Sequence, residues 1–318
     1  MRIADEIMLG RARQFPMLDR TLARIPHKIF FDRHDLSKAA IVAGSGRSGT
    51  TWVGQVLGSI SHYRLMFEPF HCKETRIVRD WHWRQYVRPD DRRATYVGPA
   101  SFILSGRVHS DWIDKLNAEV FPRGRLIKDI RIQLLLPWMH ETFPEIPIVI
   151  VTRHPCAVAL SRMALGWETS LTPLLEQGEL IHDYLSPFVS EMEHAKDEFD
   201  RCLILWCAEN YVPIQYFSSR NYGSQMHTPG DPAYLTRYED ICADPETEFG
   251  KLADFFGWQV NQESKALMKK PSAMTAKHSA ILSGGNLAEA WRKKITDAQL
   301  ASARRLLEIF QLNHLYSV

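Results

Sequence analysis

One twelve-residue segment, 41–52, constrains this chain more than any other part of it. An apolar run typical of a buried strand breaks into a turn rich in glycine and serine, and an apolar helical pattern follows. Successive backbone N–H groups of such a turn, together with the positive end of the following helix, form a concave anion site that glycines keep accessible. The segment therefore predicts a phosphate-binding loop between a strand and a helix.

Two common nucleotide-binding motifs fit this loop only in part. The pattern G-x-G-x-x-G from Gly44 matches the dinucleotide fingerprint, and Glu68 lies near the distance of the acid that holds a ribose. The pattern G-x4-G also begins a Walker A loop, but Thr50 stands where a kinase or ATPase needs a lysine. A P-loop kinase or nucleotide-binding regulator is therefore the less favoured class. A plain connecting turn is disfavoured too, since it has no need of Arg-Ser-Gly-Thr-Thr.

The whole string from Gly46 to Trp52 resembles the loop with which sulfotransferases bind 3'-phosphoadenosine 5'-phosphosulfate (PAPS). The resemblance extends from about residue 39 to the C-terminus. It implies a P-loop NTPase-like, three-layer α/β fold with a central parallel sheet flanked by helices. For Trp52, stacking on adenine and core packing are both open. The loop residues that the resemblance assigns to PAPS are Gly46, Arg47, Ser48, Gly49, Thr50, Thr51 and Trp52.

A second strand-to-helix junction carries an arginine and a serine. Residues 146–152 are typical of a buried strand, Arg153 follows it, and Pro155 suits a first helical turn. A guanidinium offers two parallel donors to a phosphate, and Ser161, two helical turns further on, can reach the same group. In sulfotransferases residues at this spacing hold the 3'-phosphate that distinguishes PAPS from ATP. The resemblance therefore assigns Arg153 and Ser161 to that phosphate.

A carboxylate follows the short apolar run 65–67. An alcohol is a poor nucleophile, and a positioned carboxylate can take its proton as the S–O bond forms. In the carbohydrate and tyrosyl-protein branches of the family a glutamate about this far beyond the loop is the general base. The resemblance assigns this role to Glu68. A cap or a salt bridge is the plain structural alternative, and His71 and Asp129 are the reserve bases.

Lys128 interrupts another apolar run, 126–130. In the steroid and phenol branch the corresponding lysine is followed, two residues on, by a catalytic histidine, and here Ile130 holds that position. This difference favours Glu68 as the base. The resemblance implies that Arg47 and Lys128 flank the bridging and sulfuryl oxygens and stabilise charge on the leaving phosphate. A lysine that carries its ammonium group to solvent at a strand edge is the alternative.

The C-terminal third gives weaker signals. Residues 234–241 resemble the family's last core strand and the start of the next helix, which suggests that Tyr238 contacts the nucleotide. The segment 270–290 lies where relatives close a lid loop over the adenine and the 3'-phosphate. Lys277 is the residue that we expect to contribute there, although an ordinary solvated loop has a similar composition.

The order of strand-like and helical patterns predicts a single domain over residues 38–318. Short apolar runs that alternate with helical patterns indicate a parallel sheet covered on both faces. Residues 1–37 are expected to form a helical arm, packed on the core or on a partner subunit, which would suit a homodimer. The predicted strands are 39–44, 65–67, 126–130, 146–152 and 233–237.

Residues 73–125 are interpreted as an acceptor-binding insert. Between 73 and 93 there are seven Lys/Arg and four Asp/Glu, interleaved with Trp81, Trp83 and Tyr86. Indole rings stack on sugars and arginines pair with carboxylates or sulfates, so a carbohydrate hydroxyl is the expected acceptor. A small-molecule or tyrosyl acceptor is the alternative, and a surface helix with ordinary tryptophan packing is the plain structural one.

Composition excludes several other classes of protein. A net charge of +2 with dispersed basic residues does not suit a nucleic-acid binder. Five scattered cysteines support neither a disulfide framework nor a metal site, and the expected mechanism requires no metal because arginine and lysine supply the positive charge. Without a long apolar span or a signal sequence, we expect a soluble, cytoplasmic enzyme of bacterial type; removal of an N-terminal anchor is the alternative.

Overall fold

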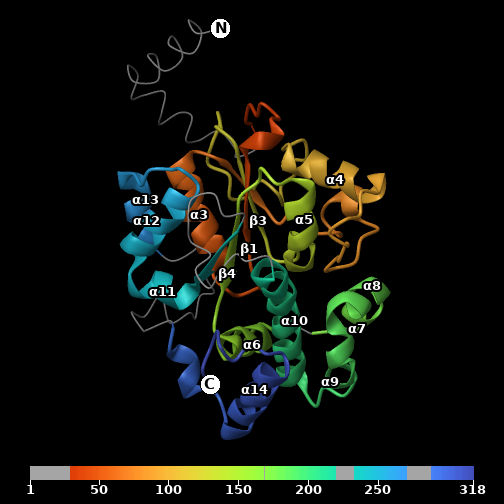
Figure 1. The fold of residues 1–318 in the computed structure, drawn as a ribbon. Helices are drawn as coiled ribbons and strands as arrows, with labels where there is room; N and C mark the ends of the chain where they lie inside the picture. Colours follow the sequence, from red (N-terminus) through yellow and green to blue (C-terminus); the bar gives the residue numbers. More distant parts are fainter. Residues whose placement is uncertain (1–28, 168, 220–232, 271–287) are drawn as a thin grey trace, which may run out of the picture.

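The computed structural model describes residues 29–167, 169–219, 233–270 and 288–318. At its centre lies a sheet of five parallel strands in the order β2-β3-β1-β4-β5 (Figure 1). All five predicted strands are present, and their ends differ from the predicted ends by at most two residues. The predicted α/β fold is confirmed. The strands are β1 (Ala39–Ala43), β2 (Arg64–Phe67), β3 (Arg125–Asp129), β4 (Ile148–Thr152) and β5 (Ala233–Arg237).

The strand sequences explain why the sheet is parallel and covered. Every residue of β1, β2, β3 and β4 is buried, as expected for strands that have helices on both faces. In the register of the sheet, Lys128 of β3 lies opposite Val42 on one side and Phe67 on the other. A lysine therefore occupies a fully buried position near the carboxyl end of an otherwise apolar strand.

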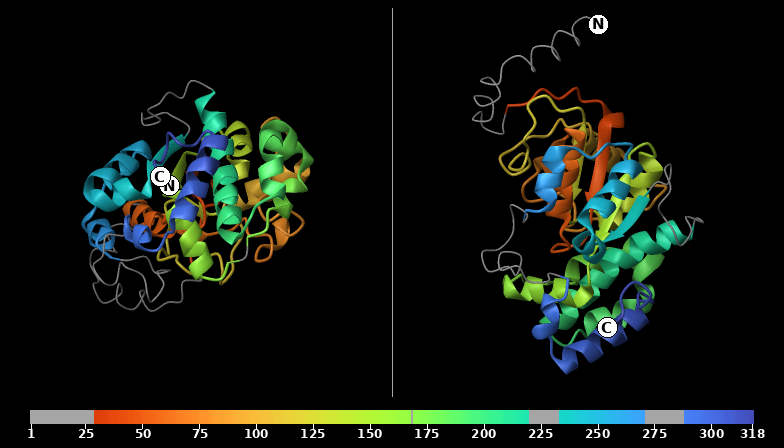
Figure 2. Two further views of the ribbon diagram at one scale, coloured as in Figure 1. Left: turned by 90° about the horizontal axis from the view of Figure 1, so that it is seen from below. Right: turned by 90° about the vertical axis from the view of Figure 1, so that its left-hand side faces the viewer.

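Helices cover the two faces of the sheet (Figures 1 and 2). One face packs against α3, α11, α12 and α13, and the other against α4, α5 and the C-terminal end of α10. These helices are α3 (Thr50–Ser61), α4 (Ala94–Leu104), α5 (Leu136–Thr142), α10 (Glu198–Ser218), α11 (Tyr238–Ala243), α12 (Pro245–Phe255) and α13 (Gln262–Met268). This is the three-layer arrangement that the resemblance implied.

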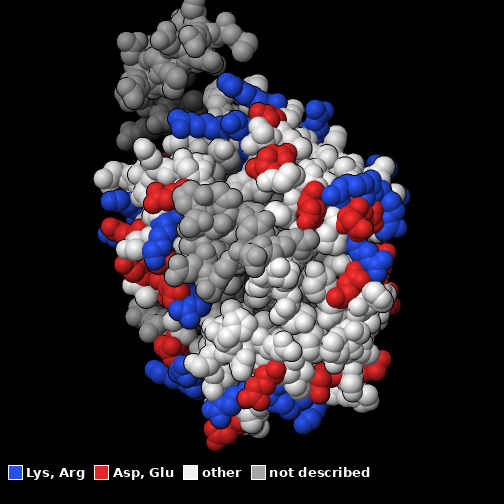
Figure 3. Space-filling model, in the orientation of Figure 1, with Lys and Arg blue, Asp and Glu red and all other residues white. Residues whose placement is uncertain are grey.

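On the face of the molecule shown in Figure 3, acidic and basic side chains are interspersed, in keeping with the net charge of +2. Within the described parts of the chain, each helix is too short or too polar to cross a bilayer. The same residues contain no cluster of His, Cys, Asp and Glu suited to a metal ion, and the five cysteines are free thiols.

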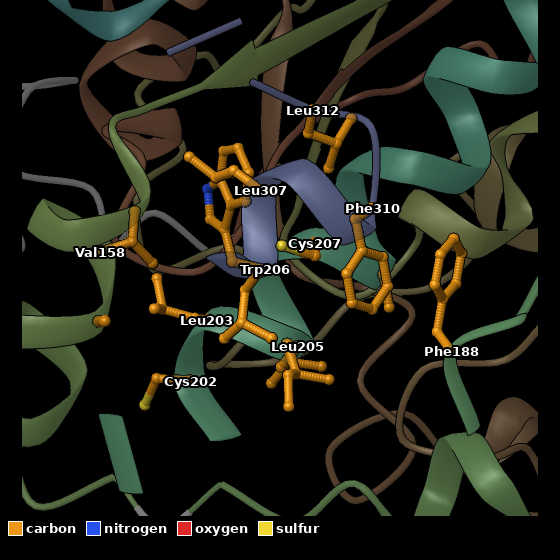
Figure 4. Close-up of a cluster of buried hydrophobic side chains, with 14 of the residues drawn as sticks. Val158, Phe188, Cys202, Leu203, Leu205, Trp206, Cys207, Leu307, Phe310 and Leu312 are labelled. Atoms are coloured by element: carbon orange, nitrogen blue, oxygen red, sulfur yellow. The ribbon is translucent and has the colours of Figure 1, made fainter. Parts of the chain in front are cut away.

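A separate group of helices lies beyond the carboxyl end of the sheet (Figure 1). Its core joins α6 (Pro155–Ala164), α10 and α14 (Asp297–Ile309) through large apolar side chains, including Trp206, Leu307 and Phe310 (Figure 4). The indole N–H of Trp206 donates to the backbone carbonyl of Arg153 at 3.1 Å, so this core fixes the turn after β4. The other α-helices in the described residues are α7 (Thr172–Leu175), α8 (Gly178–Leu180) and α9 (Val189–Glu193).

Two predicted segments fall largely outside the described residues. Of the predicted N-terminal arm, 29–35 have no regular secondary structure and are followed by a 3-10 turn, Leu36–Lys38. Asp32 of this stretch pairs with Arg125 at the start of β3. Residues 1–28, most of the 270–290 segment and Lys277 are outside the description, so the helical arm and the lid loop stay predictions.

Candidate active site

The carboxyl ends of the five strands bring the predicted site residues to one edge of the sheet. In the order of the sheet, Glu68 follows β2, Lys128 lies in β3, the loop 44–49 follows β1, Arg153 follows β4, and Tyr238 follows β5. Ligands of parallel α/β sheets bind at this edge. The loop lies in the middle, with Glu68 and Lys128 on one side and Arg153 and Tyr238 on the other.

The loop has the backbone geometry of an anion cradle. Arg47 and Gly49 both adopt left-handed conformations, with φ of 81° and 86°, and Gly49 directly precedes α3. A Cβ atom at Gly49 would lie 2.3 Å from Cδ2 of Tyr238, so only glycine fits there. The hydroxyl of Ser48 is buried and has no hydrogen-bond partner among the described residues. A buried donor without a partner is costly, and a bound phosphate oxygen would satisfy it.

The predicted 3'-phosphate residues meet beside the loop. Nη1 of Arg153 donates to the backbone carbonyl of Arg47 at 3.0 Å, and its guanidinium lies 4.5 Å from the centre of the Tyr238 ring. Nε of Arg47 donates to Oγ of Ser161 at 3.0 Å. Burial, and then the charge of Arg153, lower the pKa of Arg47. Two half-buried guanidinium groups and a hydroxyl are thus gathered where an anion would offset their repulsion.

In this arrangement Arg47 contacts α6 and not Lys128. Arg47 bonds to Ser161, and Lys128 bonds to Glu68. That both cations flank the transferred group stays a prediction. Trp52 contacts the rings of Tyr238 and Phe249 edge-on, and its N–H donates to the backbone at 3.4 Å. It is half-buried and packs against α12 and α13.

On the other side of the loop, Glu68 lies between two cations. Its Oε1 accepts from Nζ of Lys128 at 2.6 Å, and its Oε2 accepts from Nη1 of Arg131 at 2.5 Å. The backbone of Glu68 is left-handed, with φ of 47°, and its N–H donates to the carbonyl of Lys128. A non-glycine residue held in this conformation carries backbone strain, which is frequent at functional sites. The salt bridge that was the alternative role of Glu68 is thus present, within a cluster suited to chemistry.

Burial and neighbouring charges shift the pKa values of Glu68 and Lys128 in opposite directions. Burial raises the pKa of Glu68, but the charges of Lys128 and Arg131 outweigh it and hold the pKa below its usual value. Burial lowers the pKa of Lys128, while Glu68 partly restores it. Each group therefore keeps its partners charged, and Glu68 is a carboxylate at neutral pH.

The two reserve bases are less suited to the role. Burial, followed by the charge of Arg131, lowers the pKa of His71 to about 4, and the ring lies edge-on to Trp83 and Trp112. The carboxylate of Asp129 accepts from the backbone N–H groups of Phe70 and Arg131, and burial raises its pKa to about 6. Asp129 is fully buried, and its oxygens already fix the turn after β3.

Arg131 was not among the residues predicted from the sequence. The only signal for it was a second cation three residues after Lys128, beyond the end of the strand. Its guanidinium stacks 4.5 Å from the centre of the Trp83 ring, while Trp112 donates to the backbone carbonyl of Glu68 at 3.4 Å. Of the three aromatic residues named in the insert, Trp83 therefore reaches the Glu68 cluster.

The other two aromatic residues of the insert serve the core. Trp81 packs against Phe70 and Tyr96, and Tyr86 is buried among the helices around α10. The hydroxyl of Tyr86 donates to Asp183 at 2.9 Å. The insert is therefore mixed: part of it completes the core, and the part around Trp83 borders the site.

A second buried carboxylate also lies between two cations. Glu209 of α10 pairs with Arg84 of the insert and with Arg162 of α6, the latter at 2.9 Å. Nε of Arg162 donates to the backbone carbonyl of Gly46 at 3.3 Å. This cluster connects the insert, two helices and the phosphate-binding loop, and it was not predicted from the sequence.

A sequence model of the sulfotransferase family matches residues 40–262, which is more than half of the chain. The chain belongs to the sulfotransferase family. The match spans the phosphate-binding loop, Glu68, Lys128 and the β4–α6 junction, so the predicted family and enzyme class are confirmed. No curated protein matches the chain.

Several solved sulfotransferase structures are similar to this sulfotransferase in fold. The sulfotransferase domain from the curacin biosynthetic pathway has 15% sequence identity and a TM-score of 0.47, over 86% of this chain and 97% of that chain. The domain from the olefin synthase of Synechococcus PCC 7002 has 14% identity and a TM-score of 0.47, over 88% and 95%. Mouse sulfotransferase SULT7A1, complexed with PAP, has 13% identity and a TM-score of 0.46, over 93% of each chain.

Proposed function

We propose that this sulfotransferase moves the sulfuryl group of PAPS to an acceptor hydroxyl, with Glu68 as general base. The observation that carries the proposal is a charged carboxylate held at the end of β2, in contact with Lys128, on the same sheet edge as the phosphate-binding loop. A P-loop kinase is not supported, since the loop lacks the lysine that a kinase needs.

The residues around the loop suit PAPS. The cradle at 46–49 would hold the phosphosulfate end, and the buried Ser48 hydroxyl is a donor available for it. Arg153 and Ser161 would hold the 3'-phosphate, while Tyr238 supports both Gly49 and Arg153. When bound, PAPS supplies an activated sulfuryl group.

The chain's own residues would then handle the proton and the charge. Oε1 or Oε2 of Glu68 takes the proton of the acceptor hydroxyl, which makes the oxygen a competent nucleophile. As Glu68 becomes neutral, Lys128 loses its ionic partner and is free to stabilise the charge that develops on the departing phosphate. Arg47 stabilises the same charge from the loop side.

For the acceptor we propose a carbohydrate hydroxyl. The region around Glu68 offers two half-buried tryptophans, Trp83 and Trp112, and several cations, a combination suited to a sugar with polar substituents. A small-molecule or tyrosyl acceptor is the second candidate, because the same indole rings can contact an aryl ring.

The donor is tested by thermal unfolding with 3'-phosphoadenosine 5'-phosphate (PAP), ATP, ADP and NAD at equal concentration. A ligand present at 100 times its dissociation constant stabilises a protein by about 2.7 kcal/mol. We expect PAP to raise the midpoint most. A shift with ATP or NAD and none with PAP would contradict the proposal.

The acceptor is tested with radiolabelled PAPS against sugars, oligosaccharides, phenols and tyrosyl peptides. Label transfer to saccharides supports the first candidate, and transfer only to phenols or peptides supports the second. Glu68→Gln protein is the matched control, because it should bind PAP but transfer little label to any acceptor.

A further inference from the structure

The cations near Glu68 outnumber the carboxylates that pair with them. Lys128 and Arg131 share Glu68, but Lys115 is a third cation in the same place. Its Nζ lies 3.6 Å from the centre of the Phe67 ring and 3.5 Å from that of Trp112. Lys115 makes no hydrogen bond or ion pair with any residue in the described parts of the chain.

Lys115 and Lys128 both contact the ring of Phe67, the last residue before Glu68. Burial lowers the pKa of Lys115, and the nearby charge of Glu68 partly offsets this. An ammonium group that is half-buried on two aromatic faces, without an anion in contact, is more costly than one in water. A ligand anion at this place would therefore gain a strong partner.

Arg131 provides a second donor that is not used. Its Nη1 bonds to Glu68, but its Nε is buried and has no hydrogen-bond partner among the described residues. The Arg131 side chain is only 10% exposed. A buried arginine donor without an acceptor is destabilising, and a bound oxyanion would supply the missing acceptor.

The nearby carboxylates Asp129 and Glu74 do not pair with Lys115 or with Nε of Arg131. Asp129 is occupied by two backbone N–H groups, and Glu74 is exposed and makes no ion pair with a described residue. The two indole rings beside Glu68 carry cations: Arg131 lies over Trp83, which was expected to stack on a sugar, and Lys115 lies over Trp112. This part of the site therefore presents positive charge to a ligand beside the base.

We propose that the acceptor carries an oxyanion, a carboxylate or a sulfate, close to the hydroxyl that is sulfated, and that Lys115 and Arg131 bind it. The inference rests on the proposed function, since it places the acceptor against Glu68. The substrate class is then an acidic saccharide. A neutral acceptor would leave the charge of Lys115 without an anion in contact.

The test compares two acceptors that differ only in charge. We would use a hexasaccharide of alternating glucuronic acid and N-acetylglucosamine, and the same hexasaccharide with its carboxylates reduced to alcohols. Dissociation constants are measured by calorimetry on PAP-loaded protein. The wild type should bind the acidic form at least tenfold more tightly, and added salt should reduce this preference.

The decisive variant is Lys115→Met, which keeps the apolar packing on Trp112 and removes the charge. The preference for the acidic form should fall about tenfold, as for loss of one charge-assisted hydrogen bond. Lys115→Arg should retain the preference. Lys251→Met is the control, because Lys251 pairs with Glu248 on α12 and its loss changes the net charge equally.

Three results would contradict the proposal of an acidic acceptor. A wild-type protein that binds PAP but shows no preference for the acidic form, or binds neither form, contradicts the inference. An unchanged preference in Lys115→Met also contradicts it. Failure to bind PAP, by contrast, counts against the proposed function itself, and retained PAP affinity in the variants shows that they are folded.

Discussion

Two buried carboxylates in this protein, Glu68 and Glu209, each lie between two cations. One lies at the edge of the sheet where ligands bind, and the other lies within a helix. Glu209 lies in the middle of α10 with 1% of its side chain exposed, and its partner Arg162 holds the backbone of the phosphate-binding loop. Glu68 lies at the end of β2 in a strained left-handed conformation. Its surroundings contain further cations and half-buried indole rings.

The two clusters differ in how many of their charged groups are left to bind a ligand. In the Glu209 cluster the carboxylate connects the insert, α6 and α10, so its charge is used to hold the fold together. In the Glu68 cluster, Nε of Arg131 has no hydrogen-bond partner among the described residues, and the ammonium of Lys115 contacts aromatic rings but no anion there. The same combination of one glutamate and two cations can therefore serve structure in one place and chemistry in another, depending on what surrounds it.

The largest expected effect is a loss of turnover on substitution of Glu68. Glu68→Gln keeps the shape of the side chain but removes the base, so turnover should fall by about 100- to 10,000-fold while PAP affinity stays nearly intact. Turnover with radiolabelled PAPS and calorimetry with PAP measure the two effects. Glu74→Gln, the same change at an exposed site on the insert, is the control. If Glu68→Gln retains most of the rate, the base must be sought at His71 or Asp129.

The next effect concerns stability. Glu209→Gln leaves Arg84 and Arg162 without their shared anion, and breaking a buried ion pair costs about 3–5 kcal/mol. Denaturant unfolding should show this loss, and Glu193→Gln at an exposed site should not.

The pH dependence of the Glu209 contribution follows from its pKa. Burial raises the pKa of Glu209, but Arg162 and Arg84 outweigh it and hold the pKa below the ordinary 4.5. A group with a depressed pKa stabilises the fold above its unfolded value and loses that contribution as the pH falls through the folded value. The difference between wild type and Glu209→Gln should therefore shrink below pH 4.5. A constant difference would mean that the charge of Glu209 is not what stabilises the fold.

A smaller effect is expected at Arg153 and Ser161, the residues assigned to the 3'-phosphate, which belong to neither the Glu68 nor the Glu209 cluster. Arg153→Ala removes a charge-assisted pair of donors, so PAP should bind about 10- to 100-fold more weakly; Ser161→Ala should weaken it only a few-fold. Calorimetry measures both, with the exposed Arg79→Ala as the control for charge. Unchanged PAP affinity in Arg153→Ala would refute its assignment to the 3'-phosphate.

The smallest effect sharpens the assignment of the base. Arg131→Met removes one of the two charges that hold the pKa of Glu68 down, so this pKa should rise. Activity requires the carboxylate form, and the acidic limb of the kcat/KM profile should move to higher pH by the same amount. The limb should be absent in Glu68→Gln. An acidic limb that does not move in Arg131→Met would indicate that another group controls it.

Much of this site could be predicted because its parts are local in sequence. The strand, turn and helix around Gly49 need a particular run of residue types, and the same is true of the β4–α6 junction with Arg153 and Ser161. Glu68 could be found because it ends an apolar run. Arg131 and Glu209 could not, because a cation beyond a strand and a glutamate within a helix look ordinary until their partners are known.

The sequence by itself determined the five strands, the phosphate-binding loop and the family, since each depends on a periodic or contiguous pattern. Only the tertiary structure decided the order β2-β3-β1-β4-β5, which puts Glu68 and Lys128 on one side of the loop and Arg153 on the other. It also decided that Arg131 and Lys115 meet at Glu68. The physical reason is that a local pattern specifies a backbone conformation, whereas charges distant in the chain meet only when the whole core packs.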